Sequence, residues 1–98
     1  MKNAMTLNPK DNVTTLLEKA DEGEKIQLID SDKQNLGTIV VKKDIPFAHK
    51  VALCDIPENG EVIKSGEVIG KATRLICAGE HAHVHNIVSI EGTRGKQA

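Results

Sequence analysis

The sequence predicts a small, mainly β domain with one short helix near its N-terminus. Short runs rich in Val and Ile alternate with turn residues about every dozen positions, which is typical of compact folds built from short strands. The length of 98 residues suits a single domain. Because Phe47 is the single aromatic residue, the core is expected to consist of Val, Ile, Leu and Ala.

The composition argues against two classes of partner. The chain carries 13 basic and 14 acidic residues, with a formal charge of −1 and no long run of either sign. Such a balance disfavours electrostatic binding to nucleic acid or to a membrane surface. The absence of Trp and Tyr also removes the rings on which nucleic-acid modules stack bases. Since the sequence contains no apolar signal core and no membrane span, we expect a soluble cytoplasmic protein.

The predicted helix lies in the first quarter of the chain. Residues 1–10 suggest a flexible, extended lead-in. In "DNVTTLLEKADEGE", Asp11 or Asn12 can cap a helix, and Gly23 stands just past its end. Between them, apolar residues recur at helical spacing, at Val13, Leu16, Leu17 and Ala20. We therefore predict a short amphipathic helix over about residues 13–21, packed against a sheet.

Strands and turns are predicted for the rest of the domain. The strand-like segments are "KIQLID", "TIVVKKDI", "HKVALCDI", two runs within "EVIKSGEVIGKATRLI", and "HAHVHNIVSI". The segments "SDKQNLG", "PENG" and "CAGE" have the composition of turns. A weak internal repetition is present, because "KKDIPFAHKVAL", "LCDIPENGEVI" and "TRLICAGEHAHV" each run from an Ile through a turn into a strand. The domain is expected to span residues 11–90, with a polar tail over 91–98.

The stretch "GEHAHVHN" holds three of the four histidines at alternate positions, His81, His83 and His85. In a strand, alternate side chains share one face and lie about 6.5–7 Å apart along the chain. The outer two would then lie about 13 Å apart at the backbone, so a straight strand supplies at most two ligands to one ion, and the third histidine faces elsewhere or lies on a bend. Neutral imidazoles suit iron, zinc, nickel or copper. Metal binding is therefore favoured over acid–base work alone, with a solvent-facing polar strand as the alternative.

Other residues can complete such a site or support it. Further ligands can come from a partner protein or from His49, Asp55, Cys77 or Glu80. Lys50, next to His49, can bind a carboxylate, and Asn86 can form hydrogen bonds through both ends of its amide. Cys54 and Cys77 are interpreted as two small buried residues without a disulfide, with a role in metal binding or redox chemistry as the alternative.

Residues 49–86 resemble the altronate dehydratase family through the combination of "HKVAL", "GEVIKSGEVIGKAT" and "GEHAHVHN". The upstream "DNVTTLLEKADEGEKI" is similar to the opening of the same module, so the resemblance covers residues 11–86. This module is the N-terminal or small-subunit part of these enzymes and is often called a SAF domain. The resemblance implies a β-clip fold with a short helix.

The resemblance also implies lyase chemistry on sugar acids or related 2-hydroxy acids, with a divalent metal, Fe²⁺ or else Mn²⁺. The family includes altronate dehydratase, galactarate dehydratase and the two-subunit sulfolactate sulfo-lyase. The leading hypothesis is the small subunit of a hydro-lyase that dehydrates a sugar acid such as D-altronate and completes the site of a large catalytic subunit. The alternatives are the alpha subunit of a (2R)-sulfolactate sulfo-lyase and, in another class, a non-catalytic module that binds a carbohydrate acid or a metal.

Under this hypothesis the residues take three roles. The metal ligands are His81, His83 and His85. Of these, His83 and His85 are also the catalytic candidates. The substrate-binding residues are His49, Lys50 and Asn86. The expected partners are the large subunit and the sugar acid, and a homo-oligomer is a further option.

Two positions depart from the pattern of the family. Ala48 replaces the glycine that usually precedes the His-Lys pair, so this turn is expected to be reshaped. Ser65 stands where an aromatic residue is common. The histidine set of "GEHAHVHN" is of the altronate and sulfolactate type, which ranks the galactarate branch lower.

Overall fold

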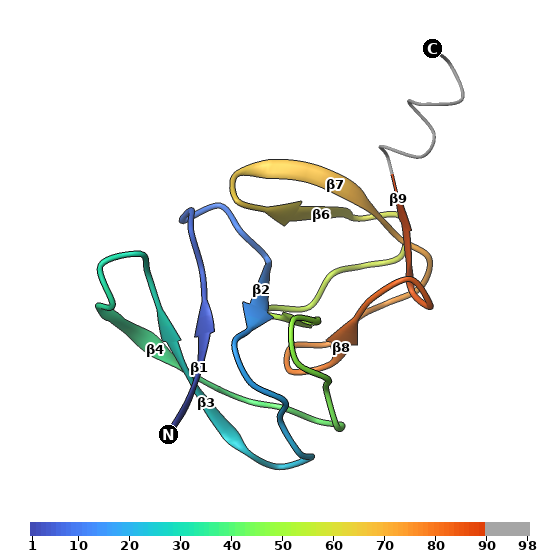
Figure 1. Cartoon of the computed structure of the whole chain (residues 1–98). Helices are drawn as coiled ribbons and strands as arrows, with labels where there is room; N and C mark the ends of the chain where they lie inside the picture. The colour runs from blue at the N-terminus through green and yellow to red at the C-terminus, as the bar shows by residue number, and fades with distance from the viewer. Residues whose placement is uncertain (90–98) are drawn as a thin grey trace.

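The computed structural model describes residues 1–89. These residues form strands and no helix (Figure 1). The strands are β1 (Lys2–Met5), β2 (Val13–Leu16), β3 (Lys25–Ile29), β4 (Asn35–Val40), β5 (Lys50–Ala52), β6 (Glu61–Lys64), β7 (Glu67–Ala72), β8 (His81–Ala82) and β9 (Ile87–Ser89). They form a six-stranded sheet in the order β4-β3-β1-β2-β5-β8 and a three-stranded sheet in the order β6-β7-β9. The predicted mainly β fold class is confirmed. The predicted tail over 91–98 lies outside the described residues.

The predicted helix over residues 13–21 is wrong, because these residues form β2 and the turn that follows it. β2 pairs in antiparallel fashion with both β1 and β5. Two successive side chains, Val13 and Thr14, are buried, and the Thr14 hydroxyl donates to the carbonyl of Met5. A run of Val-Thr-Thr has a β-branched side chain at each position, which favours a strand over a helix.

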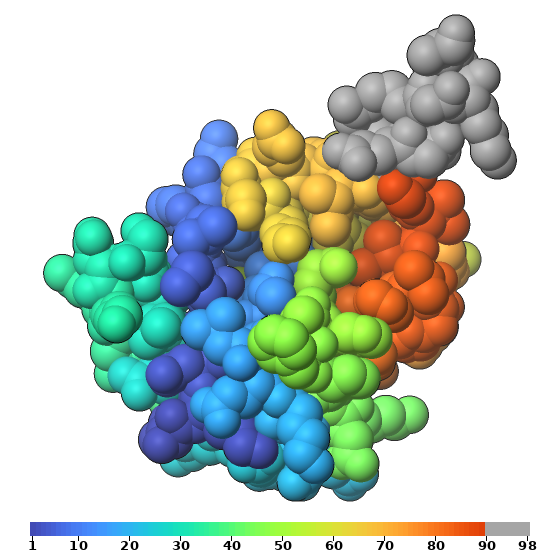
Figure 2. Space-filling model, viewed as in Figure 1, coloured from blue at the N-terminus to red at the C-terminus, as the bar shows by residue number. Residues whose placement is uncertain are grey.

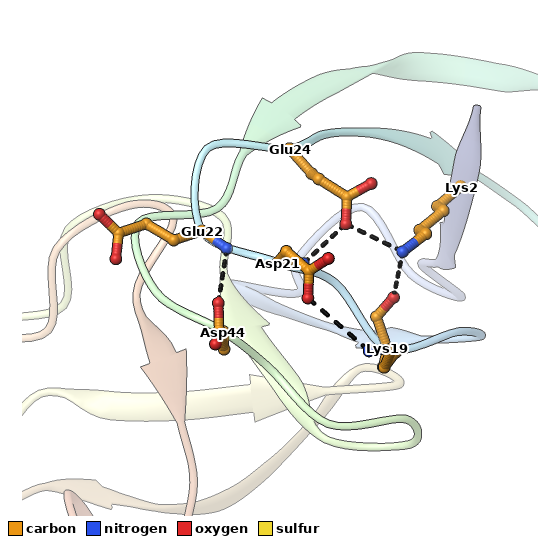
Figure 3. A network of polar contacts seen from close by, with 6 residues as sticks. All are labelled: Lys2, Lys19, Asp21, Glu22, Glu24 and Asp44. Carbon is orange, nitrogen blue, oxygen red and sulfur yellow. Dashed lines mark hydrogen bonds and ion pairs between the residues drawn. The ribbon is translucent and has the colours of Figure 1, made fainter.

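Residues 1–10, expected to be a flexible lead-in, contribute β1 to the interior of the six-stranded sheet. β1 pairs with β2 in antiparallel fashion and with β3 in parallel fashion. Lys2 ties its start to the turn before β3, since its ammonium lies 2.9 Å from the Glu24 carboxylate and 2.8 Å from the carbonyl of Lys19 (Figure 3). Ala4 at its centre is fully buried. The folded unit therefore begins with β1.

One turn motif occurs four times, at residues 17–23, 42–48, 53–59 and 73–79. In each copy the chain bends, forms one isolated bridge and turns again. Each copy ends on a residue with a positive φ, namely Gly23, Ala48, Asn59 and Gly79. The last three copies correspond to the internal repetition of the sequence, which is thereby confirmed. The first copy has Ala20 where the others have Ile, which hides it in the sequence.

The four motifs associate in two pairs. In the first pair Ala20 and Ile45 exchange backbone hydrogen bonds of 2.9 and 2.8 Å, and in the second Ile56 and Ile76 exchange bonds of 2.7 and 2.8 Å. Each pair lies in its own apolar cluster. The first cluster comprises Ala4, Leu16, Ala20, Ile26, Val41, Ile45 and Val51. The second comprises Val13, Ala52, Ile56, Val62, Ala72, Ile76 and Ala82. The expected aliphatic core is confirmed, in two parts.

The surface shows where the two ends of the larger sheet lie. In Figure 2 the β3–β4 hairpin (teal) projects on one side, and the segment that carries β8 and β9 (orange-red) lies on the other. Next to it lies the segment around residue 50 (green), as the β5–β8 pairing requires. Residues 1–89 include no helix long and apolar enough to cross a membrane.

The two cysteines lie in the turn motifs rather than in the core. Cys54 is exposed, Cys77 is half-buried, and both are free. The expectation of two buried cysteines was therefore wrong, because the apolar positions of these motifs are taken by Ile56 and Ile76.

Candidate functional site

The pairing of β5 with β8 brings the first two histidines together. His49 immediately precedes β5 and His81 opens β8, and Val51 is the register partner of His81. His49 Nδ1 and His81 Nε2 lie 2.9 Å apart, so one ring nitrogen donates a hydrogen bond to the other. The rings are nearly parallel, at 26°, with centroids 5.0 Å apart.

A turn at residues 83–86 folds the histidine row onto itself. The predicted strand over "HAHVHNIVSI" is interrupted there, between β8 and β9. The His83 ring stacks on His49 with centroids 3.9 Å apart, and the centroids of His83 and His81 are 5.5 Å apart. The His85 ring lies with its centroid 5.0 Å from that of His81. The separation of about 13 Å that a straight strand would give therefore does not apply, because the third histidine lies on a bend.

Three imidazoles form a potential ligand set. His49, His81 and His83 each offer a nitrogen, and these atoms lie within 4.8 Å of one another. Two nitrogens bound to one tetrahedral ion at about 2.0–2.1 Å lie roughly 3.3 Å apart, so small ring rotations suffice. His85 is exposed and lies against His81 at the rim of the cluster. The structure thus groups His49, rather than the predicted His85, with the other two.

Burial favours the neutral form of two of these imidazoles. The pKa of His81 is lowered to about 4, first by burial and then by the neighbouring His85, His49, His83 and Lys50 side chains. The pKa of His83 is also lowered, first by burial and then by the charges of His49, Lys50 and His85. Neutral imidazole is the form that binds a metal. Moreover, His83 Nδ1 is buried and has no hydrogen-bond partner among residues 1–89.

Asn86 fixes the turn that carries these rings. It is fully buried, its Oδ1 accepts from the backbone N–H of His83 at 2.8 Å, and its Nδ2 donates to the carbonyl of His81 at 2.8 Å. Its own backbone N–H donates to the carbonyl of His83 at 3.0 Å. Because both ends of the amide are bonded to backbone, the structure supports a positioning role for Asn86.

Lys50 lies beside the cluster, at the start of β5. It lines a pocket of about 220 Å³ together with Ile69, His83, Val84, Ile87 and Ser89. The pKa of Lys50 is lowered, mainly by burial and further by the charge of Lys64. The sequence analysis named Lys50 as a candidate substrate-binding residue but did not predict the pocket, whose walls come from β5, β7, β9 and the 83–86 turn.

The other ligand candidates stabilise the turn motifs instead. Glu80 Oε1 accepts from the backbone N–H of Cys77 at 2.6 Å, and Glu80 Oε2 lies 3.9 Å from the Arg74 guanidinium. Asp55 accepts from the backbone N–H of Ala78 at 2.8 Å. Within residues 1–89, the potential ligand set does not include the predicted additional ligands Asp55, Cys77 and Glu80.

Comparison with known proteins agrees with the resemblance. The family model for the altronate/galactarate dehydratase SAF domain matches residues 2–90. Altronate dehydratase of Bacillus subtilis (strain 168) is 38% identical over 86 residues, which are 88% of this chain and 16% of that protein. The (2R)-sulfolactate sulfo-lyase subunit alpha of Paracoccus pantotrophus is 44% identical over 48 residues, 49% of this chain and 72% of that protein.

Galactarate dehydratase (L-threo-forming) of Escherichia coli (strain K12) is also similar, with 66% identity over 35 residues, 36% of this chain and 7% of that protein. The chain thus spans a small part of the dehydratases and most of one sulfo-lyase alpha subunit. These relatives are named as dehydratases or as a sulfo-lyase subunit, and the family match takes in nearly the whole chain. On these grounds the chain belongs to the altronate/galactarate dehydratase SAF-domain family.

Proposed function

We propose that the chain is the SAF-domain subunit of a metal-dependent hydro-lyase that dehydrates a sugar acid such as D-altronate, in complex with a large catalytic subunit. The observation that carries this proposal is the set of three imidazoles within 4.8 Å of one another. The 38% identity to an altronate dehydratase over 86 residues supports the choice of a sugar acid as substrate. A cytoplasmic location, inferred from composition, and a homo-oligomer are secondary proposals.

The residues fit a divalent metal ion. Neutral imidazole nitrogens suit iron among the first-row ions. The family resemblance makes Fe²⁺ the first candidate and Mn²⁺ the second. His83 Nδ1 is buried and has no hydrogen-bond partner in the described part of the chain, which is unfavourable unless a ligand satisfies it. Three protein ligands leave further positions open for substrate. When bound, such an ion would supply Lewis-acid polarisation and hold a carboxylate and a hydroxyl together.

The histidines divide between two tasks in this proposal. Dehydration requires removal of the proton next to the carboxylate and a proton donor for the departing hydroxide. His49, His81 and His83 would hold the ion. His85 is exposed at the rim, next to His81, and is the better placed of the two catalytic candidates to exchange a proton with substrate. His83, the other candidate, is mostly covered by its neighbours and is better suited to ligation.

Reconstitution tests this function. The chain and the large subunit from the same host would be purified separately, loaded with Fe²⁺, and assayed alone and mixed on D-altronate. We expect activity from the mixture and none from the chain alone. Combined replacement of His49, His81 and His83 by Asn should lower the activity by more than about 100-fold, since it removes the proposed ligands. Lys71→Met, an exposed change on β7, serves as the control.

A triple variant as active as the unchanged chain would contradict the assigned ligands. Inactivity of a properly assembled complex on every sugar acid would contradict the dehydratase proposal. Persistent binding of metal or acid in that case would favour the non-catalytic module.

The sulfo-lyase alternative is favoured by one specific observation. The chain covers 72% of the alpha subunit of the Paracoccus pantotrophus enzyme, against 16% of the altronate dehydratase. The same reconstituted complex would be offered (2R)-sulfolactate, with release of sulfite as the readout. Sulfite release without dehydration of D-altronate would replace the first proposal by this one.

A further inference from the structure

We infer that the pocket beside the histidine cluster is a subsite for one small oxyanion, a carboxylate or a sulfonate, which the Lys50 ammonium binds. The inference rests on the proposed function only where it identifies this oxyanion as the acid group of the substrate. The binding itself is a property of residues that this chain contains.

The first ground is that Lys50 has no counter-ion within residues 1–89. The ion pairs found within residues 1–89 join Lys2 to Glu24, Lys19 to Asp21 and Arg74 to Glu80, and none involves Lys50. Lys50 is half-buried, and the positive charge of Lys64 on β6 opposes its own. Taking an ammonium partly out of water without an opposite charge is unfavourable. An anion in the pocket would remove that penalty.

The second ground is the lining of the pocket. Its polar members are Lys50, His83 and Ser89, and its apolar walls are Ile69, Val84 and Ile87. No carboxylate lies among these lining residues, so nothing in the described part of the pocket repels an anion. Apolar walls lower the local dielectric and strengthen the attraction between an ammonium and an oxyanion.

The third ground is size. The pocket measures about 220 Å³, and a water molecule occupies about 30 Å³ of the liquid, so the space equals roughly seven waters. This is enough room for an acid group and the carbons next to it.

The position of His83 connects this subsite to the metal cluster. Its side chain lines the pocket and its ring also stacks on that of His49. An acid group held by Lys50 would thus lie next to the imidazoles, with its 2-hydroxyl carbon close to the proposed metal. The arrangement matches a 2-hydroxy acid, whose carboxylate and hydroxyl can then be bound from two sides.

The test uses the complete chain, freed of metal with a chelator. Acetate, glycolate and methanesulfonate would be titrated separately while NMR follows the His83 ring and the Lys50 side chain, with acetamide as the uncharged probe. We expect saturable shifts with the three anions and none with acetamide. Acetate and methanesulfonate separate the carboxylate from the sulfonate source of the ligand.

Two lysine variants give matched outcomes. Lys50→Met should weaken binding of the anions by about tenfold or more, since it removes a charge-assisted hydrogen bond. Lys71→Met removes the same charge from an exposed position outside the pocket, and should change binding by less than about twofold. Lys50→Arg keeps the charge and should retain most of the affinity. Its binding would show that position 50 tolerates substitution and that the loss in Lys50→Met comes from the missing charge.

The inference is overturned if no anion gives a saturable shift, or if the two Met variants weaken binding equally. These measurements need neither the metal nor the large subunit. A complex without lyase activity would therefore contradict the proposed function and leave the subsite standing, whereas loss of the subsite would leave the metal cluster untouched.

Discussion

Ala48 is held in a backbone conformation that its side chain disfavours. Its φ is 69°, in the left-handed region, and its N–H donates to the carbonyl of Leu16 at 3.0 Å. The equivalent residues of the other three motifs are Gly23, Asn59 and Gly79, which are the residue types that tolerate this region best. The sequence resemblance expects glycine here. Ala48 therefore keeps the turn in place at the expense of local strain.

Replacing Ala48 by Gly should stabilise the chain. Relief of the left-handed strain, about 1–2 kcal/mol for alanine, exceeds the entropy that glycine adds to the unfolded state, so we expect a net gain of about 0.5–1 kcal/mol. Urea unfolding measures it. Ala4→Gly in β1, where φ is not positive, serves as the control and should lower the free energy of unfolding by about 1 kcal/mol. A loss in both variants would contradict the strain at Ala48.

His81 should make the stability of the metal-free chain depend on pH. Its pKa is about 4 in the folded chain, against 6.5 for a free side chain, with burial as the main cause. Between these values unfolding takes up a proton, so the free energy of unfolding falls as the pH falls from about 6.5 to about 4. Below that range His81 contributes no further change.

Urea unfolding across this range checks the prediction. His81→Asn should flatten the dependence between pH 6.5 and pH 4.5. Glu24→Gln is the control, because the pKa of Glu24 is lowered from 4.5, mainly by the backbone N–H of Asp21, and its contribution is lost only below that value. An unchanged slope in His81→Asn would rule out His81 as the source.

At the scale of elements, the 83–86 turn decides the geometry of the histidines. A continuous strand would spread three imidazoles along one face, whereas the turn returns His83 and His85 to His81. The buried amide of Asn86 closes this turn through two side-chain bonds of 2.8 Å. The arrangement of the histidine cluster therefore depends on the 83–86 turn.

Asn86→Ala should loosen both the turn and the cluster. It leaves the N–H of His83 and the carbonyl of His81 without their partners, which costs about 2–4 kcal/mol of unfolding free energy. We also expect the affinity for Co²⁺, followed by its absorption spectrum, to fall by about 10–100-fold. Gln34→Ala, which removes an exposed amide, should change neither quantity. Unaltered Co²⁺ affinity in Asn86→Ala would mean that the turn does not position the ligands.

The strands were predictable where the pattern is local. β3, β5, β6 and β7 coincide with Val/Ile-rich runs bounded by turn residues, and the strand preference of β-branched side chains is already visible over three to six residues. The helix prediction failed because Val13, Leu16 and Ala20 have helical spacing but serve a strand and a bridge instead. Spacing alone cannot distinguish one continuous element from a short strand followed by a turn.

At the scale of the whole molecule, Gly79 connects the two motif pairs, each of which lies in its own apolar cluster. Its N–H donates to the carbonyl of Ala52 and its carbonyl accepts from the N–H of Lys42, which links the second motif pair to the turn motif at residues 42–48. A Cβ on Gly79 would lie 2.4 Å from the carbonyl oxygen of Val40. The backbone at residue 79 can approach that of Val40 this closely only because glycine has no side chain.

Gly79→Ala should destabilise the chain more than Gly23→Ala. Both glycines have similar angles, φ 88° and φ 87°, but the space around Gly23 is open to 4 Å. Gly23→Ala should therefore cost only the backbone strain, about 1–2 kcal/mol. Gly79→Ala adds the overlap with Val40 and should cost at least about 1 kcal/mol more. Equal losses of unfolding free energy in the two variants, measured by thermal or urea unfolding, would show that the close contact with Val40 does not affect stability.

By itself, the sequence determined the β class, the positions of most turns, the aliphatic core and the family, because these follow from neighbouring residues. It also marked the histidines as unusual. Only the tertiary structure decided which of them meet. His49 and His81 are separated by 32 positions and touch because β5 pairs with β8. His83 joins them because a buried Asn86 bends the chain. Periodicity reports on local backbone, whereas a site built across strands depends on which segments bury one another.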